Sequence, residues 1–163
     1  MDVNSLFALA DKWGATPLEK HPTAPKIHTR QIGDHVFQFV RQDYKTRTDM
    51  AMGLLRQVEG FLGVAGSAGA VVSADGEAKE AAAIAFLPAM VGALARPEFA
   101  AMLEKLVAHA SVANGEKFES LAQVHVAERV FGDDLTLQIP VALSVLEVNL
   151  GDGFFNRLQG VFT

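Results

Sequence analysis

The segment that most constrains the fold is a helical stretch near the C-terminus that is apolar on two faces. It covers residues 137–150, LQIPVALSVLEVNL. One face holds Leu137, Val141, Val145 and Val148. The other face holds Leu143, Leu146 and Leu150. A helix that is apolar all round is buried, so other elements must surround this one. Asp133 is expected to cap it. Pro140 fits only if the helix begins near Ile139 or kinks there.

The one convincing β signal lies at residues 26–42, where side chains alternate on both sides of Gly33-Asp34. Side chains on opposite faces alternate from Ile27 to Ile32, before the Gly-Asp turn, and from Val36 to Arg41, after it. Alternation with period two around a Gly-Asp turn predicts a β-hairpin. A hairpin alone is marginally stable in water, so this one must pack on helices or on another chain.

The rest of the chain shows helical spacing. Helical segments are expected at residues 48–62, 77–95 and 97–113, the second of them kinked or divided in two at Pro88. Residues 118–131 are expected to form a helical or mixed segment. Thr48 is the expected cap of the first segment, Pro97 suits a first helical position, and Asn114-Gly115 is interpreted as a helix end. The predicted fold is therefore mainly α: a helical bundle of about five to six helices with an N-terminal β-hairpin and a preceding helical arm.

We divide the chain into an arm with a linker, residues 1–25, and one mainly helical domain, residues 26–163. In the arm, apolar residues recur at helical spacing at Leu6, Phe7, Leu9, Ala10 and Trp13, and Phe7, Leu9 and Trp13 are the candidate contact residues. Three prolines follow before the hairpin and predict an extended linker. The arm is thus a candidate element for self-association, as in a homo-oligomer, or for binding a partner.

Composition narrows the functional classes. The chain has 163 residues, a net charge of −5 and no cysteine. Lys and Arg form no dense cluster, which argues against nucleic acid as a partner. The start of the chain has no basic region of a signal peptide, and no uncharged apolar run reaches the roughly 18 residues that span a bilayer. A cytoplasmic protein without a membrane partner is expected.

No motif in the chain assembles an active site. The glycine-rich stretch GVAGSAGA, residues 63–70, lacks the lysine of a phosphate loop. The histidines and carboxylates do not form a set of three or more convergent metal ligands. We therefore predict no enzyme, no cofactor and no metal. A small hydrolase or ligand-binding domain that uses Ser67, His109 and His125 remains the alternative from another class.

The order of these segments resembles the tail assembly chaperones of long-tailed bacteriophages and prophages. The similar elements are IHTRQIGDHVFQFVRQ, LLRQVEGFLG, LARPEFAAMLEKLVAHASV, NGEKFE and the ending VHVAERVFGDDLTLQIPVALSVLEVNLGDGFF. The resemblance covers about residues 27–155. Within its ending, the family pattern matches Asn149, Asp152, Phe154 and Phe155, and Gly153 departs from it as an apparent insertion. Physically, this ending is interpreted as a helix C-terminus at Gly151 sealed by the two phenylalanines.

The resemblance implies a role without catalysis. Such chaperones bind the tape measure protein in the host cytoplasm, keep its long hydrophobic helices soluble and help recruit tail tube protein. They are absent from the finished virion. The alternative within phage biology is a structural minor tail or connector protein that stays in the virion.

Methionines are the candidate partner-binding residues of the helices. An apolar groove can bind an amphipathic helix, and methionine adapts its shape to irregular partners. The candidates are Met50, Met52, Met90 and Met102. The competing interpretation is that all four are core residues, since methionine is usually buried.

Deletion of residues 1–25 tests the division into arm and domain. We expect the shortened chain to keep its helical circular dichroism and to change its oligomeric state in light scattering. Loss of the helical signal would contradict a detachable arm.

Overall fold

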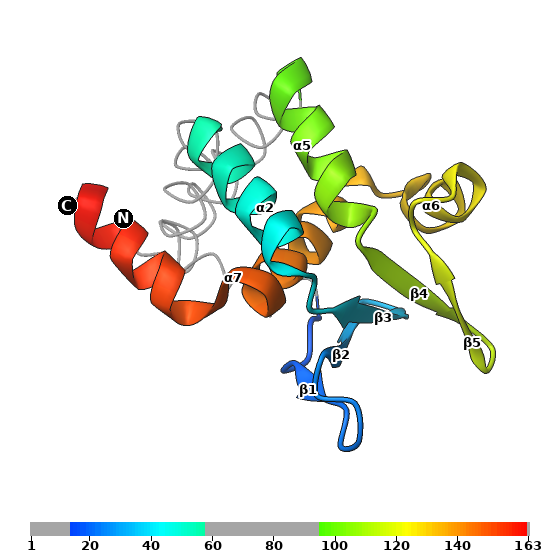
Figure 1. The fold of residues 1–163 in the computed structure, drawn as a ribbon. Helices are drawn as coiled ribbons and strands as arrows, with labels where there is room; N and C mark the ends of the chain where they lie inside the picture. Colours follow the sequence, from blue (N-terminus) through cyan, green and yellow to red (C-terminus); the bar gives the residue numbers. More distant parts are fainter. Residues whose placement is uncertain (1–13, 58–94, 163) are drawn as a thin grey trace, which may run out of the picture.

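A computed structural model describes residues 14–57 and 95–162; between residues 152 and 162 it places only the side chains of Phe154 and Arg157. The described part contains one antiparallel sheet with strand order β1-β2-β3-β4-β5 (Figure 1). Its strands are β1 Glu19–Lys20, β2 Ile27–Ile32, β3 His35–Val40, β4 Ala110–Asn114 and β5 Lys117–Ser120. The helices are α2 Tyr44–Arg56, α5 Pro97–Val107, α6 Val124–Phe131, the 3-10 turn η2 Leu135–Leu137 and α7 Gln138–Phe162.

The prediction of a mainly α bundle is wrong, because five strands form a sheet on which helices pack. The error lies mostly at Asn114-Gly115, which we interpreted as the end of a helix. Gly115 has a φ of 62° and forms the turn between β4 and β5, whose ends pair Asn114 with Lys117. The strands ASVAN and KFES are short and carry mainly small or polar residues. They therefore lack the alternation of large apolar side chains that identifies a strand.

The predicted hairpin is confirmed as β2 and β3. Ile32 pairs with His35 across a two-residue turn in which Gly33 has a φ of 58°, a conformation that favours glycine. Phe37 and Phe39 are fully buried on the face toward the helices. Burial of each ring contributes about 1.5–3 kcal/mol, so the hairpin is stabilised by the helical layer.

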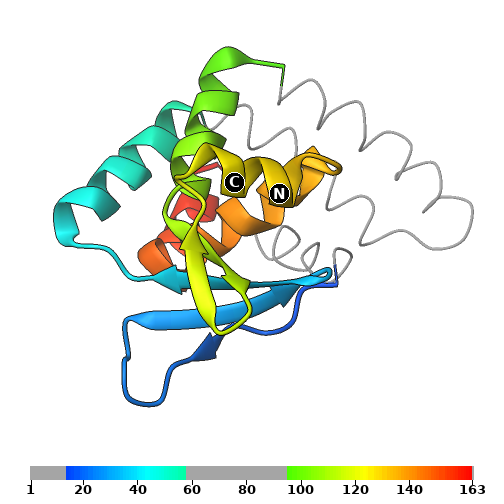
Figure 2. The same ribbon diagram turned by 90° about the vertical axis from the view of Figure 1, so that its right-hand side faces the viewer.

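The helix α7 is buried as predicted over its first half, but within an α+β arrangement. It packs against β2 and β3 of the sheet and against α5 and α2, and Figure 2 shows the sheet below the helices. The helix begins at Gln138, so Pro140 lies in its first turn and removes no helical hydrogen bond. The sequence predicted Asp133 as the capping residue before this helix. In the structure the next residue, Asp134, is the cap: it accepts a hydrogen bond from the Thr136 N–H at the start of η2.

Gly151 interrupts α7. Its φ of 69° and ψ of 170° are open in practice only to glycine. The predicted helix break at Gly151 is thus present, but the backbone continues as a second helical segment to Phe162 instead of ending there. Phe154 is partly buried and packs against the core.

The other helix ends differ partly from expectation. Asp43 caps α2 by accepting a hydrogen bond from the Thr46 N–H, whereas Thr48 donates its hydroxyl to the Tyr44 carbonyl inside the helix. Pro97 does open α5, as predicted. The expected helix at residues 77–95 and the helical part of the arm lie outside the described residues.

The end of the predicted linker is part of the sheet. β1 pairs with β2, and the Thr16 N–H donates to the Gln31 carbonyl at 2.8 Å. Ala15 and Leu18 pack against the core. A deletion that removes residues 1–25 therefore removes these contacts as well, whereas a deletion of residues 1–13 keeps them.

A buried arginine joins the sheet to α7. Arg30 is 8% exposed on the inner face of β2. Its Nη1 donates to Ser144 Oγ at 2.9 Å and to Glu147 Oε2 at 3.1 Å. Because a buried guanidinium is costly unless it is paired, these bonds specify how α7 lies on β2.

Replacement of Arg30 should therefore destabilise the fold. We expect Arg30→Ala to lower the free energy of unfolding by about 2–4 kcal/mol, because it leaves the Glu147 carboxylate partly buried without its partner. Denaturant unfolding measures the loss. The control is Arg129→Ala, which breaks the exposed pair with Glu119 and should cost less than about 1 kcal/mol. Equal losses in the two variants would contradict the role of Arg30.

Candidate functional site

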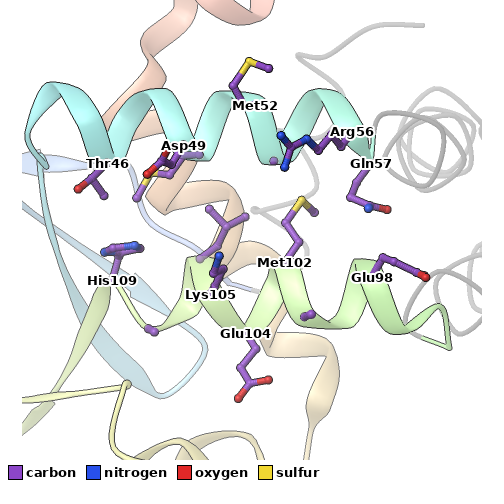
Figure 3. A pocket seen from close by; sticks show the side chains of 15 residues that line it. Thr46, Asp49, Met52, Arg56, Gln57, Glu98, Met102, Glu104, Lys105 and His109 are labelled. Carbon is purple, nitrogen blue, oxygen red and sulfur yellow. The ribbon is translucent and has the colours of Figure 1, made fainter.

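A groove of about 1010 Å³ runs between α2 and α5. Figure 3 shows the two helices crossing the view in opposite directions. Asp49 of α2 and Met102 of α5 are directed toward the space between them, whereas Met52 and Glu104 point away from it. Fifteen residues line the groove: Thr46, Asp49, Met50, Met52, Gly53, Arg56 and Gln57 from α2 and its end, and Glu98, Ala101, Met102, Glu104, Lys105, Leu106, Ala108 and His109 from α5 and its end. A space of this size is comparable with ordinary ligand sites, but it is an elongated channel between helices.

Three of the four methionines singled out from the sequence line this groove. Met50 is 7% exposed and belongs to the core, so the competing core interpretation fits its position. Met52 is 46% exposed, and Met102 is partly buried against the core. Met90 lies outside the described residues. Met102 thus points into the groove from α5, whereas the exposed Met52 projects from the side of α2 that faces away from α5 (Figure 3).

Charged side chains stand at both ends of the groove. At one end Asp49 of α2 is opposite Lys105 of α5, and at the other end Arg56 is opposite Glu98 (Figure 3). All four are exposed. None of them forms a salt bridge within 4.0 Å with another residue that the structure describes. A third exposed acid among the lining residues, Glu104, points away from α2 in Figure 3. The charged side chains at the rim that face the groove are therefore these two acids and two bases.

His109 lies at the end of the groove beyond α5. Partial burial lowers the pKa of its imidazole below the ordinary value, since desolvation disfavours the charged form. The imidazole is therefore neutral near neutral pH, and the carboxylates and cationic side chains set the charge of the groove.

Asn149 holds the start of α2, which is one wall of the groove. Its side chain is 3% exposed, and its Oδ1 accepts a hydrogen bond from the Gln42 N–H at 2.7 Å. Its Nδ2 donates to the Val145 carbonyl at 2.8 Å. The sequence singled out Asn149 as part of a family motif, and the structure shows that it joins α7 to the β3–α2 connection. Of the other motif residues, the side chains of Asp152 and Phe155 are outside the described part.

A smaller hollow of about 260 Å³ lies on the other side of α2. Tyr44, Arg47 and Asn149 are among its lining residues, and Met52 lines both hollows. The Nε of Arg47 is buried without a hydrogen-bond partner among the described residues. Met52 therefore forms a ridge between two depressions.

The outer face of the sheet is a second accessible apolar surface. Val36 and Val40 of β3 are 39% and 36% exposed, and Phe118 of β5 is 40% exposed. These side chains are spread over separate strands and form no hollow that resembles the groove.

Of the alternative set of Ser67, His109 and His125, the structure describes the two histidines. His109 follows α5, His125 lies on α6, and Ser67 is outside the described residues. In the described ranges no group of three or more His, Asp or Glu side chains could hold a metal ion. Likewise, no helix of the described part is long and apolar enough to cross a membrane.

Fold and groove together define an α+β domain with an open, methionine-lined channel between two helices. The model of the family described as phage tail assembly chaperone protein, TAC, matches residues 33–162. This match covers most of the chain, so the chain belongs to the phage tail assembly chaperone family, as the sequence resemblance indicated. No curated protein and no solved structure matches the chain.

The role of Asn149 can be tested by comparison with its partner residue. We expect Asn149→Ala to lower the free energy of unfolding by about 1–3 kcal/mol, because the partly buried Gln42 N–H loses its acceptor. Gln42→Ala is the matched control, since it keeps the backbone N–H that donates the bond. Denaturant unfolding of both variants measures the difference, and a near-neutral Asn149→Ala would exclude the proposed support of α2.

Proposed function

We propose that this chaperone binds amphipathic helices of the tape measure protein in the groove between α2 and α5. Binding takes place in the host cytoplasm, keeps the tape measure protein soluble and helps recruit tail tube protein. The chaperone is absent from the mature virion. The observation that carries the proposal is an open groove with Met102 directed into it and the exposed Met52 at its edge, in a chain that belongs to the tail assembly chaperone family.

The dimensions and chemistry of the groove favour a helix. Two helices that lie side by side with a channel between them can accept the apolar face of a third, as in helix-in-groove recognition. Met52 and Met102 offer unbranched, polarisable side chains that fit partners of different shape. A chaperone for a long protein has to accept many different helical segments, so an adaptable surface suits this role better than a rigid pocket.

The charged rim supports the same occupant. An amphipathic helix places apolar residues in the channel and polar residues at its edges. The exposed acids and bases of α2 and α5 lie where these polar edges would be. The complex would therefore bury apolar surface without burying an isolated charge, which would be costly.

Substitution of the two accessible methionines tests the proposal. We expect Met52→Glu and Met102→Glu each to reduce capture of co-expressed tape measure protein by at least about ten-fold, because loss of one buried side chain removes about 1.5–3 kcal/mol. The control is Leu55→Glu: Leu55 is 43% exposed on α2 and lines neither hollow. Undiminished capture by both methionine variants would show that the groove is not the binding site.

Two further measurements separate the chaperone from its alternatives. Mass spectrometry of purified virions should find no copies of this chain, whereas a connector or minor tail protein would be retained. Alanine replacement of Ser67 and His125 should leave capture of the tape measure protein unchanged.

A further inference from the structure

The charged residues at the rim of the groove repeat with a spacing of seven along both helices. Asp49 and Arg56 are seven residues apart on α2, and Glu98 and Lys105 are seven residues apart on α5. Seven residues of α-helix advance by about 10.5 Å, or almost two turns. Each pair therefore lies on one edge of its helix, with one charge near each end of the groove.

The signs of these charges alternate both along and across the groove. Because the helices run in opposite directions, Asp49 lies opposite Lys105 and Arg56 lies opposite Glu98 (Figure 3). If the two helices lay against each other here, these side chains of opposite sign would form salt bridges across the groove. The four form no salt bridge with one another. The groove of about 1010 Å³ between the helices leaves room for a third element whose own charges can pair with both walls.

Gly53 marks the middle of the groove on α2. It lies four residues after Asp49 and three before Arg56, and it is partly buried. A Cβ built on Gly53 would meet no described atom within 4 Å. Glycine inside a helix is less stabilising than alanine, and neither φ nor crowding in the described part requires it here. A glycine with open space above it permits a close approach of another backbone.

We propose that the groove recognises helices with a particular charge pattern, an inference that rests on the proposed function. The bound helix carries basic side chains opposite Asp49 and Glu98 and acidic side chains opposite Arg56 and Lys105. Each flank of the bound helix therefore carries one acid and one base, seven residues apart. At each end of the groove, the base lies on one flank and the acid lies on the other. Apolar residues between the flanks contact Met102, and a small residue packs over Gly53.

This pattern is the same when it is read from either end of the groove. Rotation by half a turn about an axis through the centre exchanges Asp49 with Glu98 and Arg56 with Lys105, so each charge is replaced by one of the same sign. The charges consequently select the face that a bound helix presents, and not its direction. A chaperone with this property can accept successive helices of a long partner in either orientation.

The chain's own segments outside the described residues do not fit this pattern. Residues 58–94 contain a single basic side chain, Lys79, and residues 1–13 contain only Lys12. Neither segment can place two basic side chains opposite Asp49 and Glu98. The occupant with the required chemistry is therefore a helix of a partner protein.

The test uses two synthetic helical peptides of three heptads with identical composition and identical apolar faces. The matched peptide carries the charge pattern described above, and the reversed peptide exchanges every acid with every base. Fluorescence anisotropy with the full chain should show at least about ten-fold tighter binding of the matched peptide at low salt. The difference should shrink at 1 M salt, where exposed charges are screened. Equal affinities at low salt would overturn the proposal.

A charge-exchanged chain gives the decisive comparison. It combines the four exposed substitutions Asp49→Lys, Arg56→Glu, Glu98→Lys and Lys105→Glu, and circular dichroism verifies that it folds. Its preference should invert in favour of the reversed peptide, and an unchanged preference would overturn the assignment of these residues.

Gly53→Ala tests the close approach separately. We expect this variant to unfold at a temperature about 2–4 °C higher, because alanine favours the helix, and to bind the matched peptide several-fold more weakly. Binding that is unchanged would overturn the packing of a helix over Gly53.

Capture of the tape measure protein distinguishes failure of this inference from failure of the proposed function. If the native chain captures the tape measure protein but does not discriminate between the peptides, the charge pattern is refuted and the chaperone role stands. If the chain discriminates between the peptides but does not capture the tape measure protein, the proposed partner is refuted.

Discussion

The first half of α7 is buried from water on nearly all sides, and the other described elements are arranged to cover it. The sheet covers one side through Phe37 and Phe39, and α5 covers another through Phe99 and Leu103. A helix of this kind contributes most of its stability only when every covering layer is in place. The Arg30 contacts with Ser144 and Glu147 then fix one orientation of the helix on the sheet, since an apolar surface alone is not directional.

The groove is a consequence of this arrangement. α2 and α5 both direct their large apolar side chains toward α7, with Met50 and Leu54 from the first helix and Leu103 and Leu106 from the second. They have few apolar side chains left to fill the space between them. Asn149 holds the beginning of α2 to α7, so the walls of the groove depend on the buried core although their rims are exposed.

A chaperone for a long helical protein, which is the function proposed for this chain, faces two opposing physical demands. Its surface must bury apolar side chains of its client, yet it must remain accessible before the client arrives. A narrow channel between charged rims meets both demands, because the exposed apolar area is small and water can solvate its edges. The tolerance of methionine for different partners and the symmetry of the rim charges would together allow one groove to serve many client segments.

The amino-acid sequence by itself determined the elements whose signal is local. The hairpin around Gly33, the start of α5 at Pro97, the burial of residues 139–149 and the family of the chain were all predictable, because each rests on turn residues or on regular apolar spacing. The methionines were also identified as candidates, but not their meeting in one channel. Only the tertiary structure decided that β4 and β5 extend the hairpin into a sheet, since their small side chains carry no strong pattern and are stabilised by pairing with β3. It also decided that Asp49 and Arg56 oppose Lys105 and Glu98 across a groove. The relative position of residues about fifty positions apart depends on how the helices pack on α7 and leaves no trace in local sequence.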